Sequence, residues 1–169
     1  PLHRASSTLQ SADIMTTHKI HTEFYGRLVF VGFGSIGQGV LPLILRHIGG
    51  LDASRITIVT ADEAGLGCAR EFGVRHVVCP LTRDNYQQTL RPLIGPGDFL
   101  LNLSVDVSSI DLIRMCREIG ALYLDTCIEP WAGGYTDPRL SHAERTNYAI
   151  RQRALSLRSP AGTQPGPTA

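Results

Sequence analysis

The stretch Leu28-Val29-Phe30-Val31-Gly32-Phe33-Gly34-Ser35-Ile36-Gly37 decides the fold of this chain. Four apolar residues run into a turn with three glycines, and residues 40–48 beyond it are apolar at helical spacing. A strand, a glycine turn and a helix in this order are typical of the first βαβ unit of a dinucleotide-binding fold. There, the first glycine permits the tight turn, the second lets backbone approach a pyrophosphate, and the third lets helix and strand pack closely.

The expected helix points its positive N-terminal end at the turn, and backbone N–H groups at such an end bind phosphate. The pattern therefore predicts a set of cofactor-binding residues in this segment, namely Gly32, Gly34, Ser35, Ile36 and Gly37.

An acidic residue follows the next predicted strand. Residues 56–60 are all β-branched and lead into Ala61-Asp62-Glu63. An acid at this point can accept hydrogen bonds from both hydroxyls of the adenosine ribose. Asp62 is the candidate, with Glu63 as the alternative because strand ends are uncertain by a few residues. No Arg or Lys follows closely enough to neutralise a 2′-phosphate, so the sequence favours NAD over NADP. The structural alternative is a glycine turn beside a solvated acid.

Composition narrows the class of protein. The 169 residues, 43% of them hydrophobic, are enough for one core and one domain. A net charge of +1 gives no field for nucleic acid or an anionic membrane. No apolar run approaches the roughly 20 residues that span a bilayer, and no secretory signal is recognisable. Four cysteines without a C-x-x-C pair indicate reduced, mostly buried thiols of a cytoplasmic protein, and the dispersed histidines predict no metal site.

Strands and helices alternate along the chain, which predicts a single α/β domain with a doubly wound parallel sheet of the Rossmann type. We expect a flexible leader over 1–25, the NAD-binding domain over 26–158, and a truncated tail rich in Pro and Gly over 159–169. The expected strands are 27–31, 56–60, 75–78, 98–103 and 121–124. The expected helices are 35–48 with Pro42 inside it, 63–72, 84–90, one capped by Ser108 or Ser109, and one from the capping box at 141–144 to about 157.

Ligands of such sheets bind at the carboxyl ends of the strands. Four stretches lie there, and their side chains are expected to converge on one crevice: 32–37, 61–63, 102–106 and 125–131. Asn102 and Ser104 carry amide and hydroxyl groups that could reach the nicotinamide ribose or carboxamide. Alternatively, Asn102 satisfies neighbouring backbone groups, and Ser104 or Ser108 caps the following helix.

Three long strings of the sequence resemble the N-terminal part of bacterial homospermidine synthases, in the saccharopine dehydrogenase-like group. They are GFGSIGQG at 32–39, LNLSVD at 101–106 and LDTCIEPW at 124–131, and the resemblance extends over about 26–169. It implies an enzyme that uses tightly held NAD to oxidise putrescine, condenses the imine with a second polyamine and reduces the product to homospermidine. It also implies a homodimer, with polyamines as substrates.

Carboxylates and an aromatic face suit this chemistry, because diamines are dications near neutral pH. Glu129 is the stronger catalytic candidate, since a carboxylate near the amine could take part in proton transfer. Asp125 and Trp131 are candidates too, Trp131 as a cation–π face or a cover for the nicotinamide. Alternatively, Trp131 is an aromatic residue at the edge of the core and Asp125 caps a turn.

The resemblance also implies a second domain that closes over the substrate, so we expect little synthase activity from this polypeptide alone. Two other functions remain open from the sequence. One is a fragment of another saccharopine dehydrogenase-like oxidoreductase, and the other is a regulatory domain that senses NAD without catalysis.

Overall fold

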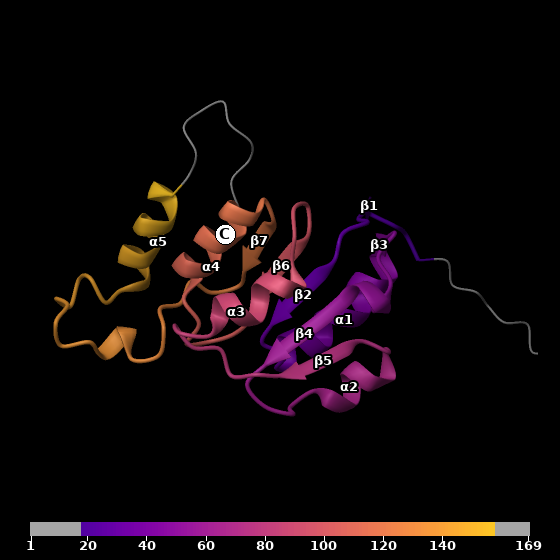
Figure 1. Ribbon diagram of the computed structural model, residues 1–169, viewed down its shortest axis with the longest axis horizontal. Coiled ribbons are helices and arrows are strands. Elements are labelled where there is room, and N and C mark those ends of the chain that lie inside the picture. The colour runs from indigo at the N-terminus through magenta and orange to yellow at the C-terminus, as the bar shows by residue number, and fades with distance from the viewer. Residues whose placement is uncertain (1–17, 158–169) are drawn as a thin grey trace, which may run out of the picture.

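A parallel five-stranded sheet forms the centre of the protein, whose computed structural model describes residues 18–157 (Figure 1). The strand order is β5-β4-β2-β6-β7. The strands are β2 (Leu28–Val31), β4 (Ile56–Thr60), β5 (Arg75–Val78), β6 (Phe99–Asn102) and β7 (Leu122–Asp125). This order confirms the doubly wound sheet, because the chain continues outward on one side of β2 and then on the other.

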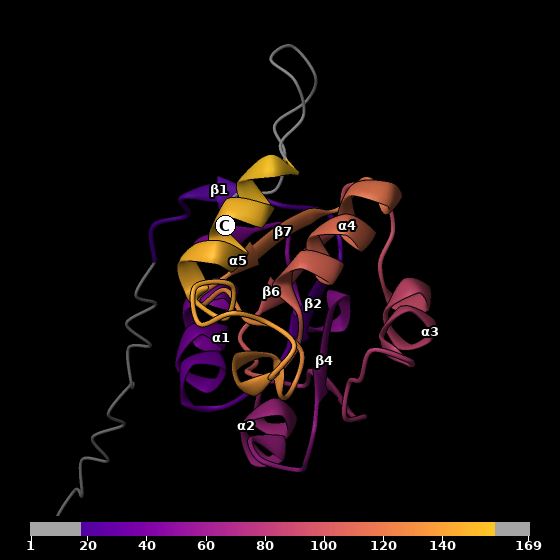
Figure 2. The same ribbon diagram turned by 90° about the vertical axis from the view of Figure 1, so that its left-hand side faces the viewer.

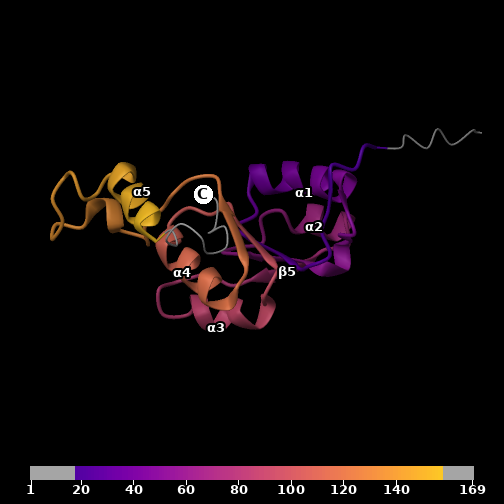
Figure 3. The same cartoon turned by 90° about the horizontal axis from the view of Figure 1, so that it is seen from above.

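Helices cover both faces of the sheet, as Figure 3 shows from above. On one face lie α1 (Ser35–His47) and α2 (Leu66–Glu71), and on the other α3 (Tyr86–Leu90) and α4 (Ser109–Ile119). Each face has its own buried apolar cluster, one around Phe30 and Leu41 and the other around Val29 and Leu112. All four residues of β2 are buried, which explains why this strand is an unbroken apolar run.

The strand register aligns the carboxyl ends of neighbouring strands. Val31, the last residue of β2, pairs with Val59 of β4 and with Asn102 of β6. Asn102 in turn pairs with Asp125 at the end of β7. The turns that follow these strands therefore leave the sheet side by side.

Pro42 lies inside α1, which runs unbroken from Ser35 to His47. A proline cannot donate to the carbonyl four residues earlier, here that of Gln38. The thiol of Cys68 lies 4.0 Å from this oxygen and faces it in place of the missing N–H. The helix begins at Ser35, where the glycine turn predicts, and the proline does not shift its start.

Two segments differ from expectation. Most of the leader expected over 1–25 lies outside the described residues. In its described part, β1 (Thr22–Glu23) pairs in parallel with β3 (Ile48–Gly49). The last helix, α5 (Asn147–Ser156), begins later than predicted. It lies next to α4 (Figures 1 and 2). The capping box forms between Ser141 and Glu144, but turns follow it, and the N-cap of α5 is Thr146. The expected tail over 159–169 lies outside the described residues.

Short 3-10 helices connect several of these elements. They are η1 (Ala53–Arg55), η2 (Arg91–Leu93) and η3 (Gly134–Thr136).

Candidate functional site

The glycine turn after β2 is wedged between the ends of the neighbouring strands. The N–H of Gly32 donates to the carbonyl of Val59 at 2.8 Å, and Gly32 has a φ of +82°. A Cβ built on Gly32 would lie 2.8 Å from the backbone nitrogen of Ser104. Only glycine fits both the conformation and the space, so the predicted tight turn is confirmed.

The other two glycines of the pattern differ in their surroundings. A Cβ on Gly37 would lie 2.8 Å from the ring of Phe33, which confirms a close approach at the start of α1. Gly34, the N-cap of α1, has open space where its Cβ would be and makes no side-chain cap. The first turn of α1 carries no acid, and Ser35 and Ile36 are exposed. Its N–H groups are therefore available to an anion.

A first hollow of about 450 Å³ lies over this turn. Ser104 after β6 and Asp62 after β4 line it, whereas Glu63 does not. Asp62 is exposed, and its Oδ1 accepts a hydrogen bond from the N–H of Ala64 at 2.8 Å. Thr60, a buried hydroxyl at the end of β4 that our sequence reasoning missed, also lines this hollow. Gly34 at the N-terminus of α1 and Asp62 thus both line the first hollow.

Asn102 is buried and faces into the protein rather than lining the first hollow. Its Oδ1 accepts hydrogen bonds from the hydroxyl of Ser104 at 2.6 Å and from the N–H of Ser104 at 3.2 Å. Its Nδ2 donates to the hydroxyl of Tyr123 at 3.3 Å. Asn102 thus satisfies neighbouring groups, while Ser104 reaches the hollow.

The hydroxyl of Tyr123 continues this buried chain of hydrogen bonds. It donates to Oδ2 of Asp125 at 2.9 Å, and burial raises the pKa of Tyr123 well above its usual value. Nearby, the hydroxyl of Ser109 accepts from the N–H of Glu129 at 2.9 Å. Buried polar contacts therefore connect the first hollow with the end of β7.

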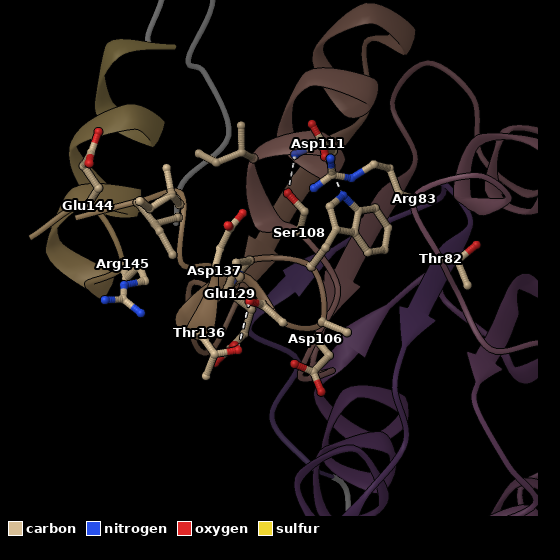
Figure 4. Close-up of a pocket in the computed structure, with 18 of the residues that line it drawn as sticks. Thr82, Arg83, Asp106, Ser108, Asp111, Glu129, Thr136, Asp137, Glu144 and Arg145 are labelled. Carbon is tan, nitrogen blue, oxygen red and sulfur yellow. Dashed lines mark hydrogen bonds between the residues drawn. The ribbon is translucent and has the colours of Figure 1, made fainter. Parts of the chain in front are cut away.

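A second hollow of about 770 Å³ adjoins the first (Figure 4). Glu129 and Asp111 line it on the side of the sheet and α4, and Glu144 and Arg145 line it on the side of α5. Glu129 and Trp131 lie here, but Asp125 lines neither hollow. The strand-end segments therefore line two adjoining hollows, which share Asp106.

Asp106 lines both hollows and was not among the predicted site residues, although it ends one of the strand-end stretches. It has a φ of +61°, which is uncommon for a residue with a side chain. Such strained residues gather at functional sites. Asp is one of the residues that tolerate a positive φ, but the sequence does not show which Asp adopts it.

Glu129 is buried, and its carboxylate influences two neighbouring groups, Cys127 and Tyr135. The thiol of Cys127 donates to Oε1 of Glu129 at 3.2 Å, and this bond together with burial raises the pKa of Cys127. Burial and the charge of Glu129 raise the pKa of Tyr135 to about 12. Both groups stay protonated near neutral pH, so Cys127 is no activated nucleophile.

Trp131 is almost fully buried at the edge of the core. Its Nε1 donates to Oδ2 of Asp111 at 2.6 Å, and its ring packs against Tyr86 with centroids 5.3 Å apart. These contacts favour the aromatic at the core edge over an open cation–π face.

The four cysteines all lie in the described part of the chain, and all are free. Only Cys116 is buried, so the expectation of mostly buried thiols is wrong. None of the helices within 18–157 is long and apolar enough to cross a membrane.

The sheet topology and the first hollow together define a dinucleotide-binding domain of the Rossmann type. The comparison with protein families agrees. The chain belongs to the family of the saccharopine dehydrogenase NADP binding domain, whose model matches residues 28–169.

Among individual proteins, the chain is similar to two homospermidine synthases. It is 45% identical to that of Blastochloris viridis over 154 residues, which are 88% of this chain and 32% of the relative. It is 44% identical to that of Mesorhizobium japonicum over 80% of this chain and 28% of the relative. The chain therefore spans about a third of the length of these relatives.

A solved structure shares the fold. It is the homospermidine synthase of Legionella pneumophila in complex with NAD, with a TM-score of 0.70 and 32% sequence identity. The similarity covers 84% of this chain and 28% of that one.

Proposed function

We propose that this chain is the NAD-binding part of an enzyme of the homospermidine synthase type. One observation supports this above all others: the uncapped N-terminus of α1 opens into a hollow that has Asp62 at its other end. The identity of 44–45% to two homospermidine synthases supports the same function.

The backbone around Gly32, Gly34, Ser35, Ile36 and Gly37 would hold the pyrophosphate. Asp62 would accept hydrogen bonds from the ribose, and its charge would repel the 2′-phosphate of NADP. This argument favours NAD although the family is described by NADP, and the neighbour from Legionella pneumophila is a complex with NAD. Bound NAD would supply a hydride acceptor that returns the hydride within one turnover.

Ser104 is the residue of the β6 end that would touch the cofactor. Asn102 would act indirectly, because its Oδ1 and its Nδ2 both form hydrogen bonds with protein groups.

The second hollow would receive the polyamine substrate, such as putrescine. Glu129 supports this, since a buried carboxylate attracts an ammonium and can move a proton at the amine. Asp125 would act indirectly, through its hydrogen bond with Tyr123. Trp131 would position Asp111, which lines the second hollow, through its own hydrogen bond. We also propose that the protein is cytoplasmic, which its four free cysteines support.

Calorimetric titration of the chain with NADH and NADPH tests the cofactor assignment. We expect NADH to bind at least tenfold more tightly than NADPH, and Asp62→Asn to remove most of this difference. Glu63→Gln, a matched loss of charge beside the first hollow, should leave the difference in place. Tighter binding of NADPH, or no binding of either cofactor by folded protein, would refute the assignment.

Substrate binding is tested on the same chain saturated with NADH. Putrescine should shift the resonances around Glu129, and Glu129→Gln should weaken this binding. The exposed Glu71, which lies on α2, is the control position, and Glu71→Gln should bind putrescine like the unaltered chain. Equal binding by both variants would exclude Glu129 from the substrate site.

A further inference from the structure

The glycine pattern leaves Phe33 unexplained, yet this side chain is almost fully buried. It packs edge to face on Phe30 of β2 with ring centroids 5.7 Å apart. The ring lies between two glycines that come from different segments. A Cβ built on Gly37 would lie 2.8 Å from Cδ2 of the ring. A Cβ built on Gly65 would lie 2.6 Å from Cδ1.

Gly65 belongs to the loop between β4 and α2 that also carries Asp62. It has a φ of +80° and is the N-cap of α2. A Cβ on Gly65 would also lie 2.9 Å from the carbonyl oxygen of Phe33 and 3.1 Å from Nε2 of Gln38. Since this carbonyl is backbone, a side chain at residue 65 could fit only if the whole loop moved away from the glycine turn.

Gln38 of α1 holds the same junction from the other side. Its Nε2 donates to the carbonyl oxygen of Phe33 at 3.3 Å. The glycine turn and the loop that carries Asp62 both line the first hollow, and they are in direct contact through Phe33 and Gly65.

We propose that Gly65 is a positioning residue of the dinucleotide site. Because it has no side chain, the loop that carries Asp62 can lie directly against Phe33, and this contact fixes the distance between Asp62 and the N-terminus of α1. The inference rests on the proposed function, because it concerns ligands that reach from the turn to Asp62.

The chain offers a matched control at the other end of the same helix. Gly73 follows α2 and has a φ of +67°, but a Cβ there would meet nothing within 4 Å. Alanine at either position strains the backbone, and only alanine at residue 65 also collides with the turn.

Calorimetric titration of the 169-residue chain with NADH compares the two variants. We expect Gly65→Ala to weaken NADH binding at least tenfold and Gly73→Ala less than twofold. ADP-ribose, which also needs both ends of the hollow, should lose as much affinity as NADH in Gly65→Ala. Nicotinamide mononucleotide, which lacks the adenosine ribose, should lose little. Equal NADH affinity of the two variants, or an equal loss for all three ligands, would overturn the proposal.

A double-mutant cycle adds a second readout. If Gly65 acts through Asp62, the effects of Gly65→Ala and Asp62→Asn on NADH binding should be less than additive. In the ligand-free chain, the side-chain amide resonances of Gln38 should shift in Gly65→Ala and not in Gly73→Ala. Additive effects on binding, or an unchanged Gln38 amide, would contradict the proposal.

Gln38→Ala keeps the proposal testable should Gly65→Ala fail to fold, since it removes a hydrogen bond without adding atoms. We expect it to weaken binding of NADH and ADP-ribose two- to fivefold and to leave nicotinamide mononucleotide unaffected. Binding like that of the unaltered chain would overturn the proposal. If the unaltered folded chain binds neither NADH nor NADPH, the proposed function fails. If it binds NADH and none of these variants differs from it, only this inference fails.

Discussion

The two hollows at the carboxyl ends of the strands are built in different ways. The first is shaped by missing side chains, because Gly32 and Gly37 let segments approach to distances that a Cβ would prevent. The second is shaped by charged side chains, among them Asp111, Glu129 and Arg145, which come from separate loops and helices. The first hollow should therefore be sensitive to one added methyl group, and the second to removal of one charge or hydroxyl.

The largest effect is expected from Gly32→Ala. The new methyl would meet the backbone of Ser104, and alanine would be strained at a φ of +82°. We expect the free energy of unfolding to fall by about 2–4 kcal/mol, measured by urea denaturation. Gly39→Ala is the control, because Gly39 lies in α1 with open space and ordinary φ, and should stabilise slightly. A stable Gly32→Ala protein would show that the first hollow does not depend on this close approach.

Tyr123→Phe tests the buried contacts that connect the first hollow with the end of β7. It leaves Nδ2 of Asn102 and Oδ2 of Asp125 without the hydroxyl between them. The free energy of unfolding should fall by about 1–3 kcal/mol. Tyr148→Phe removes a hydroxyl from a side chain that is 82% exposed and should change it little. If both variants unfolded alike, the hydrogen bonds of the Tyr123 hydroxyl would contribute nothing to stability.

Gly34→Ala separates binding from stability within the first hollow. Its methyl would enter open space, so unfolding should change little. The same methyl would stand where a pyrophosphate approaches α1, so NADH affinity should fall at least tenfold, about 1.4 kcal/mol. Gly67→Ala, also in open space but on α2, should leave NADH affinity unchanged. Unchanged affinity in Gly34→Ala would place the ligand elsewhere.

Alkaline pH probes the core beneath α4, which supports the second hollow. Burial raises the pKa of Cys116 from about 9 to about 12. The unfolded chain therefore loses this proton first, so the stability from Cys116 is complete below pH 9 and declines from there to about pH 12. The slope of unfolding free energy against pH between these values should be shallower in Cys116→Ala, by up to about 1.4 kcal/mol per pH unit. Equal slopes would mean that this thiol titrates alike in both states.

Much of the first hollow could be predicted from the sequence, because its parts are local. The turn at Gly32, the strand over 56–60 and Asp62 follow one another within about one βαβ unit, and each has a fixed place in the parallel sheet. Gly65 was not predicted, because its role depends on contact with Phe33 across two segments. From the sequence alone, a glycine needed for close packing cannot be distinguished from one that only forms a turn.

The second hollow was predicted less well for the same physical reason. Trp131 and Glu129 follow a strand end, which sequence can indicate, but whether their side chains face a ligand depends on Asp111 and Ser109 of α4. The box at Ser141 has the right pattern for a helix start and forms its hydrogen bonds, yet the helix begins only after Thr146. Local patterns specify local bonds and leave packing open.

The most direct test is to add NADH to the isotope-labelled chain and record which backbone amides shift in NMR spectra. The account predicts that the largest shifts fall on both ends of the first hollow, at residues 34–37, 60–64 and 104. Largest shifts at residues 129–145 of the second hollow, or no shifts in a folded sample, would contradict it.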